Sequence, residues 1–385
     1  MTIKRILWVG PMFNAETLKK RKVPNQAAAK WSWAFLDALT QLGVQVEGIA
    51  HCPEQVWPRG DKIWVKSKGW AIERYTVHCI GYLNLPWIRE YLLEYQYRGE
   101  IRWIFKRREK NLPFDAVLGY NVIQLHEVAV VEEAKRAGIP YFGIILDGND
   151  PRRDQWKWVL QNTKHATGLA FLSHWMVQHY PGSLPTLHFE GGGGEWKGDT
   201  ALAMREKDLI VYTGALDHWR GGDFLVEVAR QLKRQDIRIV LCGKCDREKT
   251  WARFGNDPRV EVKGFVSEAE MDDLCCRASV FLNVRDPLNG DNVLNFPSKL
   301  LNYLAYGKPV VSTWLPSFNP EYRDILEVVE QKDADSFAQK IITILDGADV
   351  DFQRKYEQIK TWYCGNKTWG GQTERLLEWM NMVCP

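Results

Sequence analysis

Short apolar segments alternate with amphipathic segments along most of the chain, and this alternation limits the fold more than any other feature. In the first half, apolar runs lie at 5–10, 44–51, 115–121, 140–148 and 168–173, with helical patterns at 26–43 and 126–138. The pattern starts again near residue 209, with apolar runs at 209–214, 237–243, 260–266 and 279–284 and helical patterns at 222–234 and 267–278. Strands that alternate with helices form parallel sheets covered on both faces. We therefore expect an α/β protein with two Rossmann-like, doubly wound domains.

A run of four glycines separates the two series. It lies within "HFEGGGGEWKGD", residues 188–199. Consecutive glycines are unfavourable inside a helix or strand, so the run predicts a hinge or a tight backbone site. We expect a first domain at 1–189, a hinge at 190–199, a second domain at 200–362 and a C-terminal helical segment at 363–385.

The bulk composition is that of an intracellular globular protein, with 45% hydrophobic and 26% charged residues. No apolar run reaches the roughly 18 residues of a membrane span. The first residues, "MTIKRILWVG", lack the long apolar region of a signal peptide. The eight cysteines are scattered, without the spacing of a disulfide framework. We interpret Cys242, in the pair Cys242-x-x-Cys245, as a core residue at the end of a strand and not as a metal ligand.

Positive charge is concentrated at the start of the chain. Residues 1–110 contain 19 Lys and Arg against 10 Asp and Glu, whereas the remainder contains 32 against 38. Basic regions attract phosphate-bearing partners, and tryptophan, of which the chain has 18, suits membrane interfaces and sugars. We expect an anionic acceptor or the inner membrane face to contact five basic residues: Lys20, Arg21, Lys22, Arg98 and Arg102. The alternative is that these residues form a solvated run and a solvated helix face.

One further stretch, "NFPSKLLNYLAYGKPVV" at 295–311, places a serine and a lysine in the first turn of a short helix. Helix N-termini present free N–H groups and partial positive charge, which favour anions. Ser298 adds a hydroxyl group and Lys299 a cation to that turn. We interpret this turn as an anion site, and the alternative is a surface helix that begins with a solvated lysine.

Four motifs in this half occur in a characteristic order: "VYTGALDHWRGGDFLVEVARQL", "IRIVLCGK", "VEVKGFVSEAEMDDLCCRASVFLNV" and "FPSKLLNYLAYGKPVVST". Over roughly residues 205–345 they resemble the nucleotide-sugar-binding half of GT-B glycosyltransferases of the retaining family-4 type. The resemblance implies two domains that face each other across a cleft, with the last helix packed back on the first domain.

The resemblance also implies an activity. A sugar would move, with retention, from a nucleotide sugar, with UDP-sugar the expected donor, to a hydroxyl group of a cell-surface glycan or lipid-linked sugar. Neither a cofactor nor a metal is implied. The protein would be cytoplasmic and peripheral at the inner membrane face.

The same resemblance assigns site residues. Lys299 matches the lysine that binds the diphosphate, and Arg220 in "HWRGG" matches a second cation. "KGFV" matches the loop whose backbone reads the nucleobase. The further donor-binding residues implied are Gly214, Gly243, Lys244, Phe265, Val266, Asp291, Asn292, Phe296, Ser298 and Asn302.

The chain departs from the family pattern at several positions. Ala215 replaces an arginine, and Asn302 replaces a glutamate that grips the ribose, so the sugar is left open. Asp147 and Asp150, in "DGND", would contact the sugar or the acceptor, although turn chemistry explains this motif equally well. The Asp-x-Asp triplets at 333–335 and 349–351 are better explained by helix capping than by a metal.

Two other functions stay open at this point. One is glycosylation of hydroxymethylated bases in DNA, with the basic domain holding phosphates. The other is a nucleotide-sugar-binding protein without catalysis, which the replacements at positions 215 and 302 allow.

Overall fold

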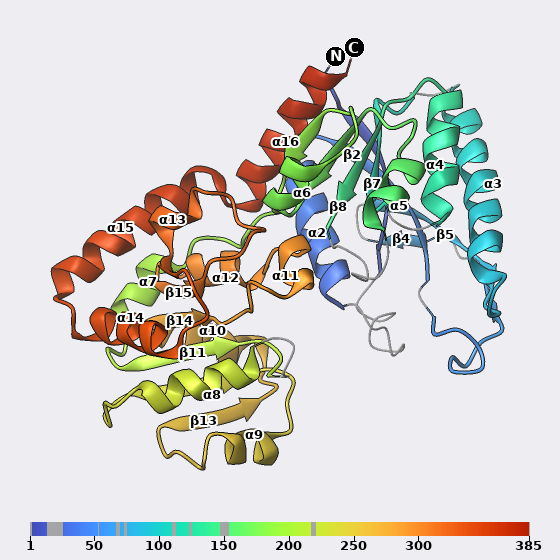
Figure 1. Cartoon of the computed structure of the whole chain (residues 1–385). Helices are drawn as coiled ribbons and strands as arrows, with labels where there is room; N and C mark the ends of the chain where they lie inside the picture. Colours follow the sequence, from blue (N-terminus) through green and yellow to red (C-terminus); the bar gives the residue numbers. More distant parts are fainter. Residues whose placement is uncertain are drawn as a thin grey trace. The chain divides into compact units, whose positions relative to one another are not determined.

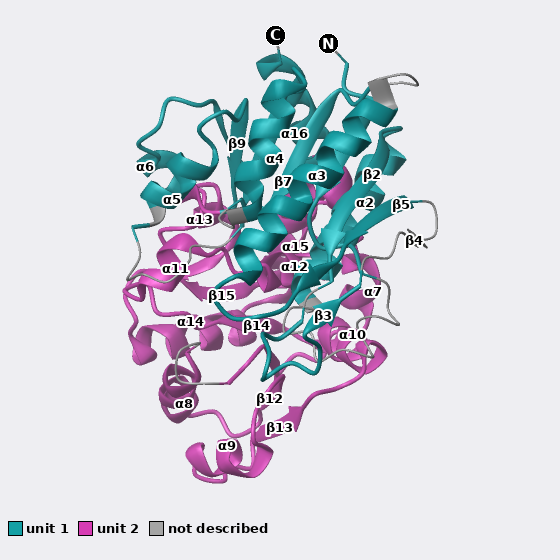
Figure 2. Ribbon diagram, turned by 90° about the vertical axis from the view of Figure 1, so that its right-hand side faces the viewer, with its two compact units in different colours: residues 1–172, 176–191, 372–385 teal, residues 173–175, 192–371 magenta. Residues whose placement is uncertain are grey.

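The structure, a computed structural model, describes residues 2–13, 26–52, 54–66, 70–72, 75–109, 113–122, 125–146, 154–216 and 221–384. The chain divides into two compact units (Figure 2). The first unit comprises residues 1–172, 176–191 and 372–385, and the second comprises residues 173–175 and 192–371. Each unit is built on a parallel sheet with helices, which confirms the predicted pair of doubly wound domains.

The first unit contains an eight-stranded sheet in the order β10-β9-β8-β7-β1-β2-β5-β4. Every pairing is parallel except that of β4 with β5, which is antiparallel. The strands are β1 Arg5–Val9, β2 Gln45–His51, β4 Trp70–Ile72, β5 Tyr75–Ile80, β7 Ala116–Tyr120, β8 Tyr141–Ile145, β9 Gly168–Phe171 and β10 Thr186–His188. A separate antiparallel ribbon joins β3 Trp64–Val65 to β6 Tyr82–Leu83.

The central strands of this sheet are buried along almost their whole length. All residues of β8 and β9 are buried, as expected for parallel strands covered on both faces. The helices of this unit are α2 Gln26–Gln41, α3 Arg89–Glu109, α4 Leu125–Arg136, α5 Gln155–Asn162 and most of α6 His174–His179 and of α16 Trp369–Val383. α2 ends where Gly43 adopts a left-handed φ of 81°. Figure 1 shows α3 beside α4 at the edge of this unit.

The end of the chain belongs to the first unit. The side chain of Trp379, on α16, is buried and its ring lies 5.4 Å from the ring of Phe142 on β8. The backbone N–H of Ile3 donates to Asn381 Oδ1 over 2.9 Å. The helix is therefore held by both the apolar centre and the amino end of this sheet.

The second unit contains a six-stranded parallel sheet in the order β13-β12-β11-β14-β15-β16. The strands are β11 Leu209–Thr213, β12 Arg238–Cys242, β13 Val260–Gly264, β14 Val280–Asn283, β15 Val310–Thr313 and β16 Glu327–Val329. Counted along the chain, this is the 3-2-1-4-5-6 order of a Rossmann sheet. The strand order reverses at β11, and ligands of such sheets bind beyond the carboxyl ends of the strands at that point.

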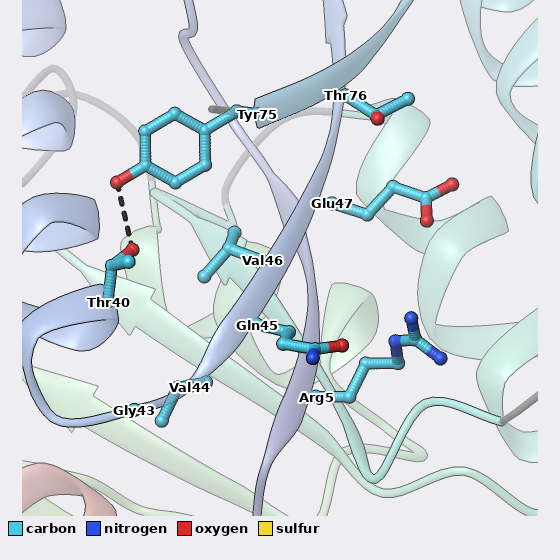
Figure 3. A pocket seen from close by; sticks show the side chains of 9 residues that line it. All are labelled: Arg5, Thr40, Gly43, Val44, Gln45, Val46, Glu47, Tyr75 and Thr76. Atoms are coloured by element: carbon cyan, nitrogen blue, oxygen red, sulfur yellow. Dashed lines mark hydrogen bonds between the residues drawn. The ribbon is translucent and has the colours of Figure 1, made fainter. Parts of the chain in front are cut away.

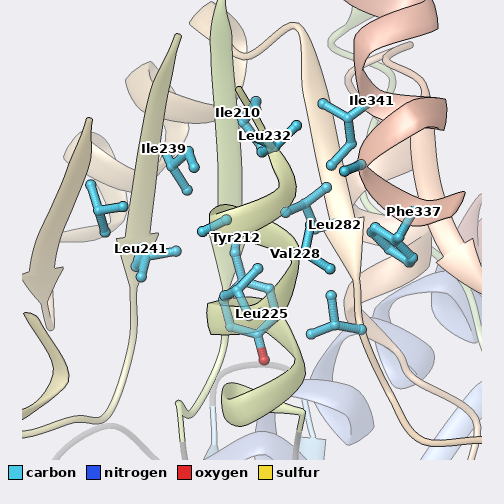
Figure 4. Close-up of a cluster of buried hydrophobic side chains, with 14 of the residues drawn as sticks. Ile210, Tyr212, Leu225, Val228, Leu232, Ile239, Leu241, Leu282, Phe337 and Ile341 are labelled. Carbon is cyan, nitrogen blue, oxygen red and sulfur yellow. The ribbon is translucent and has the colours of Figure 1, made fainter. Parts of the chain in front are cut away.

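The core of the second unit lies between the sheet and two helices. Figure 4 shows Leu225 and Val228 of α8 and Phe337 and Ile341 of α14 lying against the strands. The ring of Phe337 meets that of Phe224 edge to face, with 5.6 Å between the centroids. The helices of this unit are α7 Gly198–Ala203, α8 Gly222–Gln231, α9 Arg247–Arg253, α10 Glu268–Arg277, α11 Gly290–Leu294, α12 Lys299–Leu304, α13 Tyr322–Ile325, α14 Ala334–Asp346 and α15 Asp349–Asn366.

Two local interpretations of the sequence can be checked against this fold. Asp333 caps α14, because its side chain accepts from the backbone N–H of Ser336 over 2.7 Å. Asp349 and Asp351 lie in the first turn of α15 without a side-chain capping bond. Cys242 is a fully buried free thiol at the end of β12, and burial raises its pKa to about 11.

Candidate functional site

Three neighbouring strands of the second unit end in glycines with left-handed φ values. These are Gly214 after β11 (137°), Gly243 after β12 (138°) and Gly264 at the end of β13 (74°). The N–H of Gly243 donates to the carbonyl oxygen of Gly264 over 2.8 Å. A Cβ atom on Gly243 would lie 2.0 Å from the carbonyl oxygen of Gly214. Only glycine allows these backbones to approach so closely at the carboxyl edge of the sheet.

Tyr303, on α12, fixes that helix to the end of β11. Its hydroxyl oxygen accepts hydrogen bonds from the N–H of Thr213 (2.7 Å) and from Thr213 Oγ1 (3.0 Å), and it donates to the Thr213 carbonyl oxygen (3.1 Å). The buried ring of Tyr303 stacks on Phe281 of β14, with centroids 4.3 Å apart. Burial raises the pKa of Tyr303, so the hydroxyl stays neutral and can serve as both donor and acceptor.

Lys299 begins α12 one turn before Tyr303 and is directed to the same strand end. Its Nζ atom donates to the carbonyl oxygen of Thr213 over 3.4 Å. The same atom lies 4.0 Å from the ring centroid of Tyr212, a cation–π contact. The β11–α12 contact therefore brings a positive charge to the carboxyl end of the strand at which the sheet order reverses.

A cavity of about 250 Å³ opens beside Lys299. The exposed side chain of Asn302, one position before Tyr303, also lines it. The complete lining comprises Gly194, Glu195, Lys197, Thr213, Met271, Cys275, Lys299, Asn302, Tyr303, Ala305 and Tyr306. All of these residues belong to the second unit. The cavity combines two lysines, a carboxylate and an amide, and the lysines favour a polar, anionic ligand.

A cluster of three side chains holds one wall of this cavity. Asp272, on α10, forms an ion pair with Lys197 and accepts a hydrogen bond of 2.6 Å from the Tyr306 hydroxyl group. The hydrogen bond from Lys197 lowers the pKa of Asp272. The N–H of Lys197 also donates to the carbonyl oxygen of Ala305 over 2.8 Å. These contacts fasten the segment after the glycine run to α10 and α12.

The glycine run itself forms a tight backbone site within the second unit. Gly193 pairs with Thr368 in an isolated parallel bridge, and its N–H donates to the Lys367 carbonyl oxygen over 2.8 Å. Cβ atoms would lie 2.3 Å from Trp369 Cα at Gly192 and 2.1 Å from the Tyr363 hydroxyl oxygen at Gly193. Close approach therefore requires glycine at these two positions, as one of the two sequence interpretations expected. The hinge stays a prediction.

Several residues expected at a donor site lie at this edge of the sheet. Gly214 and Gly243 end their strands there, and Lys244 is exposed directly after Gly243. Phe265 is 81% exposed in the loop after β13, and Val266 beside it is half-buried.

Other expected residues are engaged elsewhere in the second unit. Phe296 is buried, with its ring 5.9 Å from that of Phe318 and 5.7 Å from that of Tyr322, so it is a core residue. The buried amide of Asn292 donates to the Asp286 carbonyl oxygen over 2.8 Å. Asp291 is exposed in the first turn of α11.

The side chain of Ser298 is exposed at the start of α12. The residue precedes α12 with helical dihedral angles, and its side chain makes no capping hydrogen bond. The role of its hydroxyl group in an anion site stays a prediction, as does that of Lys299.

Arg98 and Arg102 on α3 are engaged by carboxylates of the first unit. Arg98 Nη1 lies 2.7 Å from Glu132 Oε2, and Arg102 Nε lies 2.8 Å from Glu133 Oε2. Burial opposes ionisation of Glu133, but hydrogen bonds from Arg102 and Arg98 lower its pKa. The two arginines thus join α3 to α4, and α3 runs without a break through Gly99.

Six predicted site residues lie outside the described residues: Asp147, Asp150, Arg220, Lys20, Arg21 and Lys22. Sequence reasoning missed Tyr303, Tyr306 and Asp272. Tyr303 could have been identified, because positions 299 and 303 share one face of a helix, and Tyr306 lies in the turn that follows. Asp272 had no such signal, because its contacts come from segments far away in the sequence.

Another cavity, of about 350 Å³, lies in the first unit (Figure 3). It is lined by Arg5, Gln45 and Tyr75, which are the first residues of β1, β2 and β5, together with Glu47, Thr76 and other neighbours. This is the amino edge of the sheet, whereas ligands of doubly wound sheets bind at the carboxyl edge. Among the described residues, no group of three or more His, Cys, Asp or Glu side chains is placed to hold a metal ion.

Residues 207–347 match the family model described as Glycosyl transferases group 1. The match lies wholly within the second unit. The match coincides with the stretch in which the sequence resembles family-4 enzymes, and it contains the three strand-end glycines and α12.

Solved structures show the same fold over the whole chain. A glycosyltransferase from Rickettsia africae has a TM-score of 0.70 and 14% identity, covering 100% of this chain and 99% of that one. Sucrose-phosphate synthase from Thermosynechococcus elongatus has a TM-score of 0.68 and 13% identity, covering 99% of both chains. HepE from Anabaena, in complex with UDP and glucose, has a TM-score of 0.64 and 11% identity, covering 98% of this chain and 99% of that one.

A search of curated proteins found no match. The fold is thus that of GT-B glycosyltransferases, and the family and the fold together support a glycosyltransferase. None of the described helices is long and apolar enough to cross a membrane.

Proposed function

We propose that this protein is a retaining glycosyltransferase that moves a sugar from a nucleoside diphosphate sugar, with UDP-sugar the expected donor, to a hydroxyl group. One observation carries the proposal: the amine of Lys299 lies beside a polar cavity at the carboxyl end of β11. The sheet order reverses at β11, where nucleotides bind in such folds. The complex of HepE with UDP and glucose adds support.

In this proposal the chemistry depends on charge and position. The bond between the anomeric carbon and the diphosphate oxygen breaks, and its electron pair stays on the diphosphate. Lys299 would stabilise that developing charge, with Arg220 as a second cation. The acceptor oxygen would bond to the anomeric carbon on the face that the diphosphate leaves, and its proton would pass to a leaving phosphate oxygen. Asp147 and Asp150 would contact the sugar or the acceptor.

The rest of the donor would lie along the same edge of the sheet. Gly214 and Gly243 allow a phosphate group to approach the backbone closely. Asn302 would hydrogen-bond the ribose, and the loop containing Phe265 and Val266 would contact the nucleobase. The acceptor would be a cell-surface glycan or a lipid-linked sugar, and the first unit would bind it. No described observation favours DNA as the acceptor, since carboxylates already engage Arg98 and Arg102.

Calorimetric binding of UDP, GDP, CMP and TDP tests the donor site directly. We expect one nucleotide to bind, and Lys299→Ala to weaken its binding about tenfold or more, because hydrogen bonds to a charged group contribute roughly 1.5–3 kcal/mol. Lys249→Ala, an exposed lysine on α9, is the matched control and should bind like the wild type. If no nucleotide binds, or if both variants bind equally, the proposed function is wrong.

Once the nucleotide is known, labelled sugars of that class can be offered with glycan, lipid-linked and DNA acceptors. Retention is read from the anomeric configuration of the product by NMR. Nucleotide binding without any transfer would instead indicate a non-catalytic nucleotide-sugar-binding protein.

A further inference from the structure

The first unit exposes a group of large apolar side chains around the start of α3. We name this group the aromatic surface, and it consists of Ile63, Trp64, Trp87, Ile88, Tyr91 and Tyr95. Trp87 is 93% exposed, Tyr95 73% and Tyr91 68%. Single exposed apolar residues are ordinary, but a contiguous group of this size marks an interaction site.

These side chains stand on a rigid frame. The buried Asn84, between β6 and α3, donates from Nδ2 to the carbonyl oxygens of Gln55 (2.6 Å) and Lys62 (3.0 Å). Its backbone N–H donates to the carbonyl oxygen of Ile63 over 2.6 Å. The β3–β6 ribbon pairs Trp64 with Leu83. The two segments that carry the aromatic surface are therefore joined to each other by hydrogen bonds.

Trp87 combines two unfavourable features. Its φ of 70° lies in the left-handed region, which a residue with a bulky side chain rarely adopts. Its indole ring is at the same time almost wholly exposed. The neighbouring bonds from the N–H of Ile88 to the Pro86 carbonyl oxygen and from the N–H of Arg89 to the Leu85 carbonyl oxygen hold this conformation. Strain that the surrounding structure maintains is a feature of functional sites, and here it presents a tryptophan outwards.

Basic side chains flank the aromatic surface at both ends. Arg59, Lys62 and Lys66 lie on the segment that leads into and out of β3, and Lys106 and Arg107 lie at the far end of α3. All five are exposed and have no ion-pair partner among the described residues. Arg107 lies 5.1 Å from the ring of Trp103.

Carboxylates of the same region are mostly neutralised within the unit. Glu90 pairs with Arg89 (2.7 Å), Glu94 with Arg98 (3.1 Å) and Glu100 with His78 (3.2 Å). Glu54 and Asp61 are the other acids between residues 54 and 66. The charge left near the aromatic surface is therefore positive.

We propose that the aromatic surface docks on an anionic lipid bilayer, with α3 lying along the membrane interface. Tryptophan and tyrosine rings favour the headgroup level of a bilayer, because one side of the ring is apolar and the other can hydrogen-bond. Tyr91 and Tyr95 lie four residues apart on α3 and so share one face of the helix, and Trp87 lies two residues before the helix begins. Exposed aromatic rings flanked by cations suit the headgroup level of a membrane, where the cations attract anionic headgroups. This inference does not depend on nucleotide binding.

The test is sedimentation of the full chain with vesicles of phosphatidylcholine, with and without phosphatidylglycerol. We expect the wild type to sediment with the anionic vesicles. The variant Trp87→Gly removes the ring at a position whose φ glycine tolerates, so thermal stability should be kept while binding weakens about tenfold. Lys62→Gln with Lys66→Gln should also weaken binding about tenfold, but only on anionic vesicles. Trp251→Ser, an exposed tryptophan in the second unit, should bind like the wild type.

Two results with vesicles would overturn the proposal. One is a wild type that stays in the supernatant with both kinds of vesicle. The other is a Trp87→Gly variant that binds vesicles as well as the wild type does. Sedimentation-velocity runs without lipid test whether a second copy of the chain covers the aromatic surface instead. A dimer that Trp87→Gly dissociates would show this and would overturn the proposal.

Discussion

The hydroxyl oxygen of Tyr303 lies 2.7 Å from the backbone nitrogen of Thr213 and 3.1 Å from its carbonyl oxygen. One side chain on α12 therefore satisfies both backbone groups of the last residue of β11. The same carbonyl oxygen accepts a hydrogen bond from Lys299. The position of the proposed diphosphate-binding lysine thus depends on a tyrosine one turn further along the helix.

This relationship predicts the effect of Tyr303→Phe. The variant keeps the ring that stacks on Phe281 but leaves the N–H of the half-buried Thr213 without this acceptor, which costs about 1 kcal/mol. We expect a lower thermal unfolding midpoint together with weaker nucleotide binding. Tyr212→Phe is the control, because it keeps the ring beneath Lys299 and removes a hydroxyl group that donates to Ala215. Equal effects of the two variants would contradict the anchoring role of Tyr303.

A second prediction concerns the close backbone approach at Gly243. In Gly243→Ala the new Cβ atom would lie 2.0 Å from the Gly214 carbonyl oxygen, at a φ of 138°. We expect a loss of about 2 kcal/mol or more in stability, and weaker nucleotide binding, because the loops after β11 and β12 must separate. Gly255→Ala is a matched control with a φ of 69° and no atom within 4 Å of the new Cβ. It should destabilise less and leave binding unchanged, as measured by thermal unfolding and calorimetry.

Much of the fold follows from the sequence, because buried parallel strands are continuous apolar runs. The nine strands expected from the alternation match β1, β2, β7, β8, β9 and β11 to β14. The short strands β3, β4 and β6 have two or three residues each, which is too short for an alternation to be recognised. The Asp-x-Asp triplet at 349–351 indicated the start of α15 but not its length, because the aromatic and charged residues of the helix do not form a regular apolar stripe.

The candidate site was less predictable than the fold. Lys299 and the strand-end glycines are visible as motifs, because their roles are local. Phe296 belongs to the same motif but faces the core, and Arg98 pairs with carboxylates of another helix. The contact between Asp272 and Lys197 joins segments 75 positions apart. Whether a motif residue binds a ligand or contacts another part of the protein depends on tertiary packing, which the local sequence does not show.

A third prediction concerns pH. Burial would lower the pKa of His78, but hydrogen bonds to Glu100 and Glu47 outweigh it and raise the pKa to about 9. In the unfolded chain the pKa is about 6.5. The folded state therefore holds this proton more tightly, so the stabilisation is complete below pH 6.5 and is lost as the pH rises through 9.

We accordingly expect His78→Gln to lower the thermal unfolding midpoint at pH 6 and to have little effect at pH 10. His165→Gln, on the surface of the same unit, is the control at each pH. If the unfolding midpoint of His78→Gln lies below that of the wild type by the same amount from pH 6 to pH 10, the variant loses packing and not a charge interaction.

The last prediction tests the role proposed for Asn302. Its exposed side chain lines the cavity that contains Lys299, on the same face of α12. If the amide accepts a hydrogen bond from a ribose hydroxyl group, Asn302→Ala should weaken binding of the preferred nucleotide about fivefold to tenfold, since a neutral hydrogen bond contributes roughly 1 kcal/mol. Binding of the 2′,3′-dideoxy analogue should be unchanged, because the hydroxyl groups that Asn302 contacts are absent from it. Gln339→Ala, on α14, is the control. If Asn302→Ala weakens binding of both nucleotides equally, Asn302 contacts a part of the donor other than these ribose hydroxyl groups. The Lys299→Ala variant tests the diphosphate contact independently of this result.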